Sequence, residues 1–335
     1  MTNTILTRNN CNHPIVSVII PVYNRESLIN QAIDTVCQQT IQDWELILID
    51  DRSTDQTTQM IQSRIDKDSR IKLFTNSHTK GPSGARNQGL DKAMGKYIAY
   101  QDSDDEWEPY HLETMIHYLE KYPEQVDLMT ANPLRKYREN NEVFNYDTLD
   151  MENIGHSKLE NAYIISPEQL FDTQLRGRVI TTQNIVAKAE ILKKVRWNEV
   201  LNAAEDNLHN LQLSANGIKV GHIQDFHTIY WAHNDNITNC NGSHSPEKME
   251  RVLTSFVSYW RIVLDDFELS TSQRKYVEYE LANTYAWHLG YNTFEPQKKF
   301  KQANSAYLNA LKLKPTNINY WKSYIKSFIK WVLSK

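Results

Sequence analysis

Short apolar runs that alternate with helix-like segments constrain the fold of this chain more than any other feature of its sequence. The runs cover residues 16–20, 44–49, 71–74 and 97–100. Between the first two runs, apolar residues recur at helical spacing, namely Ile29, Ala32, Ile33, Val36 and Cys37. Strands that alternate with helices of this length predict an α/β fold with a mostly parallel sheet flanked by helices.

Acidic residues directly follow two of these predicted strands. Asp51 comes after the second run, and Asp102, Asp104 and Asp105 come after the fourth. Ligands of parallel α/β sheets bind beyond the carboxyl ends of the strands. We therefore expect both acidic positions on one binding edge, although they are far apart in the sequence.

Cysteine content and polarity bear on the cellular compartment. The 335 residues include three cysteines, Cys11, Cys37 and Cys240, a widely spaced set that argues against a disulfide framework and for a reducing compartment. The polar first residues lack the apolar core of a secretion signal. No run approaches the roughly 18 apolar residues of a membrane-spanning helix. We therefore expect neither secretion nor a transmembrane segment.

The cluster of Asp102, Asp104 and Asp105 supplies hard oxygen ligands of the kind that hold Mg2+ or Mn2+. An acidic turn can equally be a solvated loop or a helix cap. Here the cluster follows a predicted buried strand and precedes Trp107 and Pro109, and its spacing does not suit a calcium-binding EF-hand. The sequence therefore favours a site for a divalent cation.

A glycine-bearing loop at residues 81–89 opens a predicted helix. Backbone N–H groups at such a helix start favour an anion. The loop lacks the ending of a Walker motif and is not a dinucleotide fingerprint. Arg86 in this loop would donate to a phosphate or a sugar hydroxyl, or would form a surface salt bridge.

Three further residues suit catalysis or binding. Glu205 and Asp206 begin a segment with helical spacing, where a carboxylate is either a helix cap or a general base for an arriving hydroxyl. His233 is either a ligand of a metal or phosphate, or a structural histidine. On the residues alone, these alternatives stay open.

Five motifs, in this order, resemble the family 2 glycosyltransferases of the GT-A fold. They are VSVIIPVYN at 16–24, IDDRSTD at 49–55, GARNQG at 84–89, DSDDEW at 102–107 and the pair Glu205-Asp206. The resemblance covers roughly residues 15–240. It implies an inverting transferase that uses a nucleotide-sugar donor, most often a UDP-sugar, together with Mn2+ or Mg2+. It does not identify the sugar, the acceptor or the linkage.

The resemblance also implies roles on the donor side of the site. Pro21 and Tyr23 would line the nucleoside pocket, and Asp51 would accept a hydrogen bond from the base. Asp104 would hold the metal on the diphosphate, with Asp102 near the ribose and the donor sugar.

On the acceptor side, the resemblance implies that Asp206 is the catalytic base and that Glu205 contacts the acceptor. His233 matches a histidine of a family segment that closes over the diphosphate, and is a candidate metal ligand, although Trp231 and Asn236 depart from the family pattern around it. A bound cation would stabilise the departing diphosphate. One proton transfer then remains, from the acceptor hydroxyl to a carboxylate, and is worth about 10²- to 10⁴-fold in rate.

The same likeness divides the chain into three parts. We expect a polar leader at 1–14, a GT-A glycosyltransferase domain at 15–240 and a helical region at 241–335. The transferase domain would consist of a nucleotide-binding half, 15–120, and an acceptor half, 121–240.

The C-terminal part differs from the rest in charge. The formal net charge is −4, yet residues 296–335 carry nine lysines and no acidic residue. Apolar positions within 285–291 and 300–313 resemble one tetratricopeptide-like helix pair, which predicts an all-helical extension. Residues 318–335 form a basic amphipathic segment that would lie on an anionic membrane, or would pack its apolar stripe on the helix pair. No strand-binding groove points to nucleic acid as a partner.

We therefore predict a metal-dependent hexosyl- or N-acetylhexosaminyltransferase, cytoplasmic or peripheral on the inner face of the cytoplasmic membrane. Its acceptor would be a glycan or lipid-linked hydroxyl in bacterial cell-surface polysaccharide or lipopolysaccharide synthesis. One alternative is a non-catalytic binding protein with a relic transferase fold, against which the carboxylates at 102, 104 and 206 argue. Another is a sugar-1-phosphate nucleotidyltransferase, which would need a glycine-rich basic loop where residues 21–26 read PVYNRE.

Overall fold

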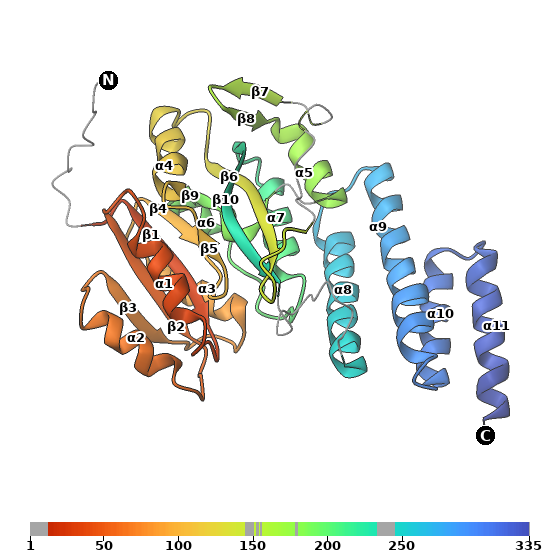
Figure 1. Cartoon of the computed structure of the whole chain (residues 1–335). Coiled ribbons are helices and arrows are strands. Elements are labelled where there is room, and N and C mark those ends of the chain that lie inside the picture. The colour runs from red at the N-terminus through yellow and green to blue at the C-terminus, as the bar shows by residue number, and fades with distance from the viewer. Residues whose placement is uncertain are drawn as a thin grey trace.

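The computed structural model describes residues 13–144, 151, 154, 156–177, 180–232 and 245–334. Within them the chain forms one sheet covered by helices on both faces, followed by a helical region (Figure 1). Residues 1–12 of the predicted polar leader lie outside the described residues.

The first half of the sheet is parallel, as predicted. Its strands lie in the order β3-β2-β1-β4, and each neighbouring pair is parallel. The strands are β1 (Val16–Val22), β2 (Trp44–Asp50), β3 (Ile71–Thr75) and β4 (Tyr97–Tyr100). The connecting helices are α1 (Ile29–Cys37), α2 (Thr57–Ile65) and α3 (Pro82–Lys92). The carboxyl ends of these parallel strands therefore lie at one edge of the sheet.

The second half of the sheet mixes strand directions. The order continues from β4 through β9, β6, β10, β8 and β7; β6 and β10 pair in parallel, and the other pairs are antiparallel. These strands are β6 (Leu128–Tyr137), β7 (His156–Leu159), β8 (Ala162–Ile165), β9 (Val186–Lys188) and β10 (Val220–Ala232), with β5 (Glu106–Trp107) paired to β10. The helices are α4 (His111–Lys121), α5 (Pro167–Arg176), the 3-10 turn η1 (Thr182–Asn184), α6 (Ala189–Lys194) and α7 (Glu205–Ala215). The whole sheet is therefore mixed.

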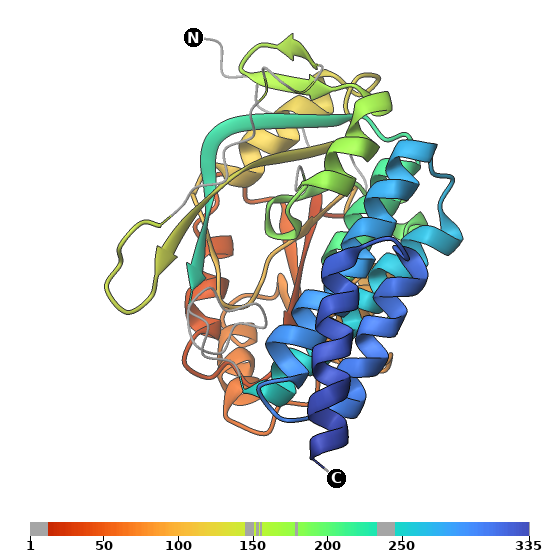
Figure 2. The ribbon, with the colours of Figure 1, turned by 90° about the vertical axis from the view of Figure 1, so that its right-hand side faces the viewer.

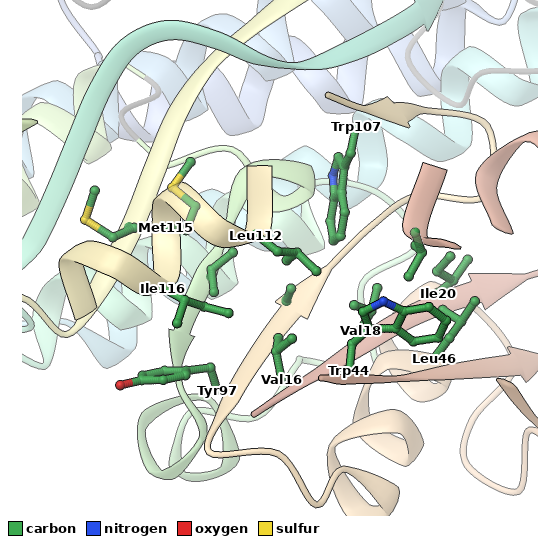
Figure 3. Close-up of a cluster of buried hydrophobic side chains, with 14 of the residues drawn as sticks. Val16, Val18, Ile20, Trp44, Leu46, Tyr97, Trp107, Leu112, Met115 and Ile116 are labelled. Atoms are coloured by element: carbon green, nitrogen blue, oxygen red, sulfur yellow. The ribbon is translucent and has the colours of Figure 1, made fainter. Parts of the chain in front are cut away.

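Alternate residues of the central strands enter two cores on opposite faces of the sheet. Val16, Val18 and Ile20 of β1 join the core with α1, α2 and α4. Ile19 joins the core with α3 and α6. Figure 3 shows the first core, where the β1 side chains lie close to Trp44 of β2. Each fully buried aliphatic side chain stabilises the fold by about 1.5–3 kcal/mol, so this alternation determines which face each strand presents to which helices.

Two glycines of GARNQG let α3 pack closely on the structure around it. A Cβ at Gly89 would lie 2.3 Å from Cγ2 of Ile19 in β1. A Cβ at Gly84 would lie 1.9 Å from the carbonyl oxygen of Thr79. Close-packed interiors leave no room for such contacts. The glycines therefore determine how near α3 lies to the sheet, and with it the position of Arg86 between them.

The helical region has a core of its own and a second core shared with the sheet domain. Its elements are α8 (Pro246–Asp266), α9 (Thr271–Asn283), the π-helical segment η2 (Thr284–Phe294), α10 (Phe300–Leu313) and α11 (Ile318–Leu333). The shared core joins Tyr259 and Val263 of α8 to Leu208 and Leu211 of α7. The other core gathers α8 to α11 around Tyr307. The predicted all-helical extension is confirmed, whereas its tetratricopeptide character and the boundary at residue 240 stay predictions.

None of the helices that the structure describes has the combination of length and hydrophobicity needed to cross a membrane.

His222 on β10 makes stability depend on pH. Its side chain is 1% exposed, and neither ring nitrogen has a hydrogen-bond partner within the described ranges. Burial and the nearby His227 lower the pKa of His222 to about 4, from about 6.5 in an unfolded chain. Between these values the unfolded chain binds a proton that the folded chain does not, so stability is lost as the pH falls from 6.5 toward 4.

We expect His222→Leu to remove that loss. The free energy of unfolding of the variant, relative to the wild type, should rise by about 2 kcal/mol between pH 7 and pH 5. Urea titrations of both proteins at the two pH values measure this difference. An equal difference at pH 7 and pH 5 would contradict the role given to His222.

Candidate active site

The predicted donor-binding residues lie along the edge where β1, β2 and β4 end. Pro21 is the penultimate residue of β1, and Tyr23 follows that strand. Asp51 follows β2, and Asp102 lies two residues beyond β4. Tyr23 is 43% exposed, and the Lys80 ammonium lies 4.6 Å from the centre of its ring. This edge therefore offers an open aromatic face beside a cation.

Two residues on this edge adopt left-handed backbone conformations. Asn24 has φ 50° and Arg52 has φ 68°. These are backbone angles that residues other than glycine rarely adopt. Hydrogen bonds tie the two loops together: the backbone N–H of Asn24 donates to Oγ of Ser53 at 2.9 Å, and that of Thr54 donates to Oδ1 of Asn24 at 2.8 Å. Strained backbone of this kind persists only where surrounding contacts hold it, and it clusters at functional sites.

Asp51 is 5% exposed and holds the loop before α3 against the edge. Its Oδ1 accepts a hydrogen bond from Nδ2 of Asn76 at 2.7 Å, and its Oδ2 accepts one from the backbone N–H of Gly81 at 2.8 Å. Each carboxylate oxygen has a second lone pair. The predicted contact between Asp51 and a nucleobase stays a prediction, and it would use these remaining lone pairs.

Arg86 on α3 lies at the centre of the site. Its Nη2 donates to Oδ1 of Asp102 at 2.7 Å, and its Nη1 lies 3.9 Å from Oε1 of Glu205. The guanidinium lies 4.5 Å from the centre of the Trp197 ring. The Arg86 side chain is only 6% exposed, whereas that of Asp102 is 31% exposed. The cation of this ion pair is therefore buried and does not form the expected alternative of a surface salt bridge, while its carboxylate partner is partly exposed. Arg86 thus joins a carboxylate after β4 to a carboxylate at the start of α7.

An aromatic stack supports the guanidinium. The Trp197 ring lies 3.9 Å from that of His209 at an angle of 14°, and its Nε1 donates to the Tyr100 hydroxyl at 3.1 Å. Asn87, next to Arg86, binds the backbone of Trp197 in both directions, at 2.9 and 3.0 Å. Burial, together with Arg86, lowers the pKa of His209 to about 3, so this ring is neutral at physiological pH. Trp197 and His209 carry no motif of their own, and sequence reasoning missed both.

Glu205 and Asp206 begin α7 on a strained turn. Ala204, directly before them, has a left-handed φ of 61°. Burial and the charge of Asp206 raise the pKa of Glu205 to about 7. Asp206 is more exposed, and its Oδ1 accepts a hydrogen bond from the backbone N–H of the next residue at 2.8 Å. The structure therefore brings Glu205 to Arg86 and leaves Asp206 facing more solvent.

Asp104 and Asp105 lie on the loop after β4 but differ in surroundings. Oδ2 of Asp104 lies 3.3 Å from Nη2 of Arg25, and its carbonyl oxygen accepts a hydrogen bond from Arg138 at 2.7 Å. Asp105 is 2% exposed, and its Oδ1 accepts a hydrogen bond from the backbone N–H of Trp231 at 3.1 Å. Burial and the charge of Asp104 raise the pKa of Asp105 well above its usual range. The hydrogen bond that Asp105 accepts therefore joins β10 to this loop, whereas the side chain of Asp104 remains partly exposed.

The oxygens of Asp102 and Asp104 fit a hard divalent cation. Burial raises the pKa of Asp102 and the charge of Asp104 raises it further, against the lowering effect of Arg86. A cation between the two carboxylates would relieve that repulsion. Across the described residues no three aspartate, glutamate, histidine or cysteine side chains are placed to hold a metal ion together, and the candidate ligand His233 lies outside them. The pair suits an ion such as Mg2+, which takes one or two carboxylates and completes its shell with phosphate and water.

Comparisons with known proteins point to one family. The model of the family described as Glycosyl transferase family 2 matches residues 17–194. The chain is 31% identical over 219 residues to TuaG of Bacillus subtilis, a glycosyltransferase assigned to teichuronic acid biosynthesis, covering 61% of this chain and 82% of TuaG. It is 38% identical over 135 residues to WfgD of Escherichia coli, a UDP-Glc:α-D-GlcNAc-diphosphoundecaprenol β-1,3-glucosyltransferase, covering 40% of this chain. This second match spans 49% of WfgD, about half of its length.

Solved structures share the fold. Residues 1–349 of S. aureus TarS, crystallised with UDP-GlcNAc, superpose with a TM-score of 0.63 at 19% identity and cover 93% of this chain and 89% of that one. The mannosyltransferase PcManGT of Pyrobaculum calidifontis, in complex with GDP-Man and Mn2+, superposes with a TM-score of 0.54 at 16% identity and covers 96% of this chain and 86% of that one. At these identities the likeness shows the fold alone.

Removing the guanidinium of Arg86 tests how much its ion pairs contribute to the free energy of unfolding. We expect Arg86→Met to lower the free energy of unfolding by about 3 kcal/mol, because the buried Glu205 and the partly exposed Asp102 lose a buried cation. The matched control is Arg64→Met, which breaks the partly exposed pair with Asp34 and should cost at most about 1 kcal/mol. Urea titrations at pH 7 measure both. Equal losses in the two variants would contradict a central role for Arg86.

Proposed function

Because the chain belongs to glycosyl transferase family 2, we propose that it moves a sugar from a nucleotide-sugar donor to a hydroxyl group of an acceptor. One observation carries the proposal. Arg86 joins Asp102, on the donor side of the GT-A site, to Glu205, on the acceptor side. Donor and acceptor groups therefore meet at one buried cation, as a transfer between two substrates requires.

We assign the donor to the edge where β1, β2 and β4 end. The ring of Tyr23, which is 43% exposed, would give a nucleobase a surface to stack on, and the Lys80 ammonium over that ring would supply positive charge to the diphosphate. TarS was crystallised with UDP-GlcNAc, and WfgD is named for UDP-Glc. These relatives support a UDP-sugar that carries a hexosyl or N-acetylhexosaminyl group.

Asp104, together with Asp102, would hold Mn2+ or Mg2+ against the donor diphosphate. When bound, such a cation supplies positive charge where the leaving diphosphate gains negative charge. The complex of PcManGT with GDP-Man and Mn2+ supports this choice of ion. Arg86 would hold Asp102 in position through the 2.7 Å hydrogen bond.

We propose Asp206 as the general base and Glu205 as a contact to the acceptor. The acceptor oxygen forms a bond to the anomeric carbon, and the bond from that carbon to the phosphate oxygen breaks. The electron pair leaves with the diphosphate, and the hydroxyl proton passes to Asp206, the more exposed of the two carboxylates. Attack on the face opposite the diphosphate inverts the anomeric centre.

We propose a lipid-linked or glycan acceptor in bacterial surface polysaccharide synthesis. WfgD is named for a diphosphoundecaprenol acceptor, and TuaG is assigned to teichuronic acid biosynthesis. Neither a relic binding protein nor a sugar-1-phosphate nucleotidyltransferase is favoured, because the family match and the assembled Asp102, Arg86 and Glu205 cluster point to a transferase.

The donor is identified by a screen of UDP release. Purified protein with Mn2+ is given UDP-glucose, UDP-GlcNAc, UDP-galactose or UDP-GalNAc and a synthetic GlcNAc-diphospholipid acceptor. With the best donor, we expect Asp206→Asn to lower kcat by about 10²- to 10⁴-fold, because the acceptor proton loses its base. We expect Asp104→Asn to raise the Mn2+ concentration needed for half-maximal rate at least about 10-fold.

The control for these variants is Asp43→Asn. Asp43 is exposed and precedes β2, at the opposite end of the strand from Asp51, so its loss should leave both values unchanged. Wild-type rates in Asp206→Asn, or no UDP release from any donor, would contradict the proposed function.

Helix α11 is the outermost element of the helical region (Figures 1 and 2). It packs through the face that carries Tyr320 and Ser327, which are 1% and 0% exposed. Five apolar residues along its outer face are 41% to 53% exposed, namely Trp321, Ile325, Phe328, Ile329 and Val332. Tyr324 packs on the core of the helical region, whereas these five side chains of the stripe are left largely exposed, so the choice between packing and membrane contact stays open. Lys322 and Lys326 are exposed beside the stripe.

We propose that the outer face of α11 lies on an anionic membrane surface, where lipid-linked acceptors are found. The exposed stripe would enter the headgroup region, and the flanking lysines would contact lipid phosphates. Deleting residues 318–335 would also remove Tyr320, whose hydroxyl donates to Asn283 at 2.6 Å. Surface substitutions on α11 therefore test the proposal more cleanly than a deletion.

We expect the double variant Ile325→Ser, Ile329→Ser to lose at least about 10-fold in affinity for phosphatidylglycerol vesicles, measured by co-sedimentation, because the buried apolar area falls. The matched control is Tyr279→Ser with Leu308→Ser, which removes exposed apolar side chains from α9 and α10. Equal binding of the wild type to neutral phosphatidylcholine vesicles, or equal losses in both double variants, would contradict the proposal.

A further inference from the structure

We propose that Ser255 of α8 is a positioning residue that holds the turn presenting Glu205 and Asp206. Ser255 lies beyond residues 17–194, where the family model matches, and it touches neither carboxylate in the structure. The inference rests on the proposed function in one respect, because it takes Asp206 as the base.

The hydroxyl of Ser255 makes three hydrogen bonds to the backbone just before the two carboxylates. Its Oγ accepts from the N–H of Asn202 at 3.2 Å and from the N–H of Ala203 at 3.0 Å, and it donates to the carbonyl oxygen of Ala203 at 2.7 Å. A serine hydroxyl has one proton and two lone pairs. The hydroxyl proton and both lone pairs of Ser255 are therefore all used in hydrogen bonds to this one turn.

The backbone conformation of this turn needs contacts from outside the turn to hold it. Ala204 has φ 61°, a conformation that an alanine adopts at a cost, and no side chain caps the start of α7. Strained backbone persists only where its neighbours hold it. Without the Ser255 contacts, the segment 202–204 would relax toward ordinary backbone angles. The first residues of α7, which include Glu205 and Asp206, would then shift.

The packing of helix α8 fixes the position of Ser255. Ser255 is 7% exposed, and Tyr259, one turn further along the same face, is 3% exposed. Tyr259 and Val263 pack in one core with Leu201 and Ala204, which precede α7, and with residues of α7 itself. The core fixes the distance between α8 and the turn, and Ser255 fixes the turn itself.

Ser255 lines a cleft of about 400 Å³ together with Asn202 and Ser258. Because Asn202 itself lines this cleft, we expect water to reach the backbone groups that a substitution of Ser255 would free. We therefore expect Ser255→Ala to fold and to relax the turn, rather than to leave buried groups without partners.

The test compares Ser255→Ala with the wild type, using the donor chosen by the UDP-release screen and the GlcNAc-diphospholipid acceptor. We expect kcat to fall about 10- to 100-fold, since a shift of about 1 Å in a catalytic group has effects of this size. The KM for the donor should stay within about twofold, because the three hydrogen bonds of Ser255 go to Asn202 and Ala203 and not to the residues of the donor edge. Ser258→Ala, a loss of a hydroxyl one turn away in the same cleft, should keep the wild-type kcat.

A double-mutant cycle separates positioning from general damage. If Ser255 acts through Asp206, Ser255→Ala should change the residual rate of Asp206→Asn by less than about twofold. A structural defect would instead lower the rate by the same factor in both backgrounds, and that outcome would overturn the inference. A wild-type kcat in Ser255→Ala would also overturn it. If Asp206→Asn itself keeps its rate, the proposed function fails, whatever Ser255 does.

Ser255→Cys provides a second variant of nearly the same shape. Its thiol is a weak donor and acceptor, so kcat should fall in the same direction while the melting temperature stays close to that of the wild type. A kcat equal to the wild type in this variant would overturn the inference even if Ser255→Ala did not fold.

Discussion

The rest of the site depends on the ion pairs that the buried guanidinium of Arg86 forms. A cation removed from water needs carboxylates beside it, and the chain supplies Asp102 from the end of β4 and Glu205 from the start of α7. The Trp197 ring supports the guanidinium on one side. Gly84 and Gly89 let α3 come close enough to place it. One charge cluster therefore joins the parallel half of the sheet to the helix that carries the proposed base.

The parallel half of the sheet and its binding edge could be predicted from local patterns. Apolar runs of strand length, separated by segments of helical spacing, permit few arrangements. The rule for carboxyl ends then places Asp51 and Asp102 on the same edge, where the structure has them. The periodicity of the sequence alone could not predict that Glu205 and Asp102 belong to the same site. The resemblance to a family implied that both belong to one site, and the residue that joins them, Arg86, appeared only in the structure.

What the sequence could not predict are contacts between distant residues without a periodic signal. Asn87 binds the backbone of Trp197 across 110 positions of sequence, and a polar side chain in a helix does not reveal such a partner. The antiparallel strands β7, β8 and β9 are only three or four residues long, too short to show alternation. The spacing in α11 identified an apolar stripe but not whether it packs, since a buried and an exposed stripe have the same period.

The central claim is a single displacement at the anomeric carbon, with the diphosphate on one face of the sugar and the base Asp206 on the other. Proton NMR of the first product formed from an α-linked UDP-sugar tests this claim most directly, because the coupling of the anomeric proton reports the configuration. The account predicts a β-linked product. A product that retains the α configuration would contradict it.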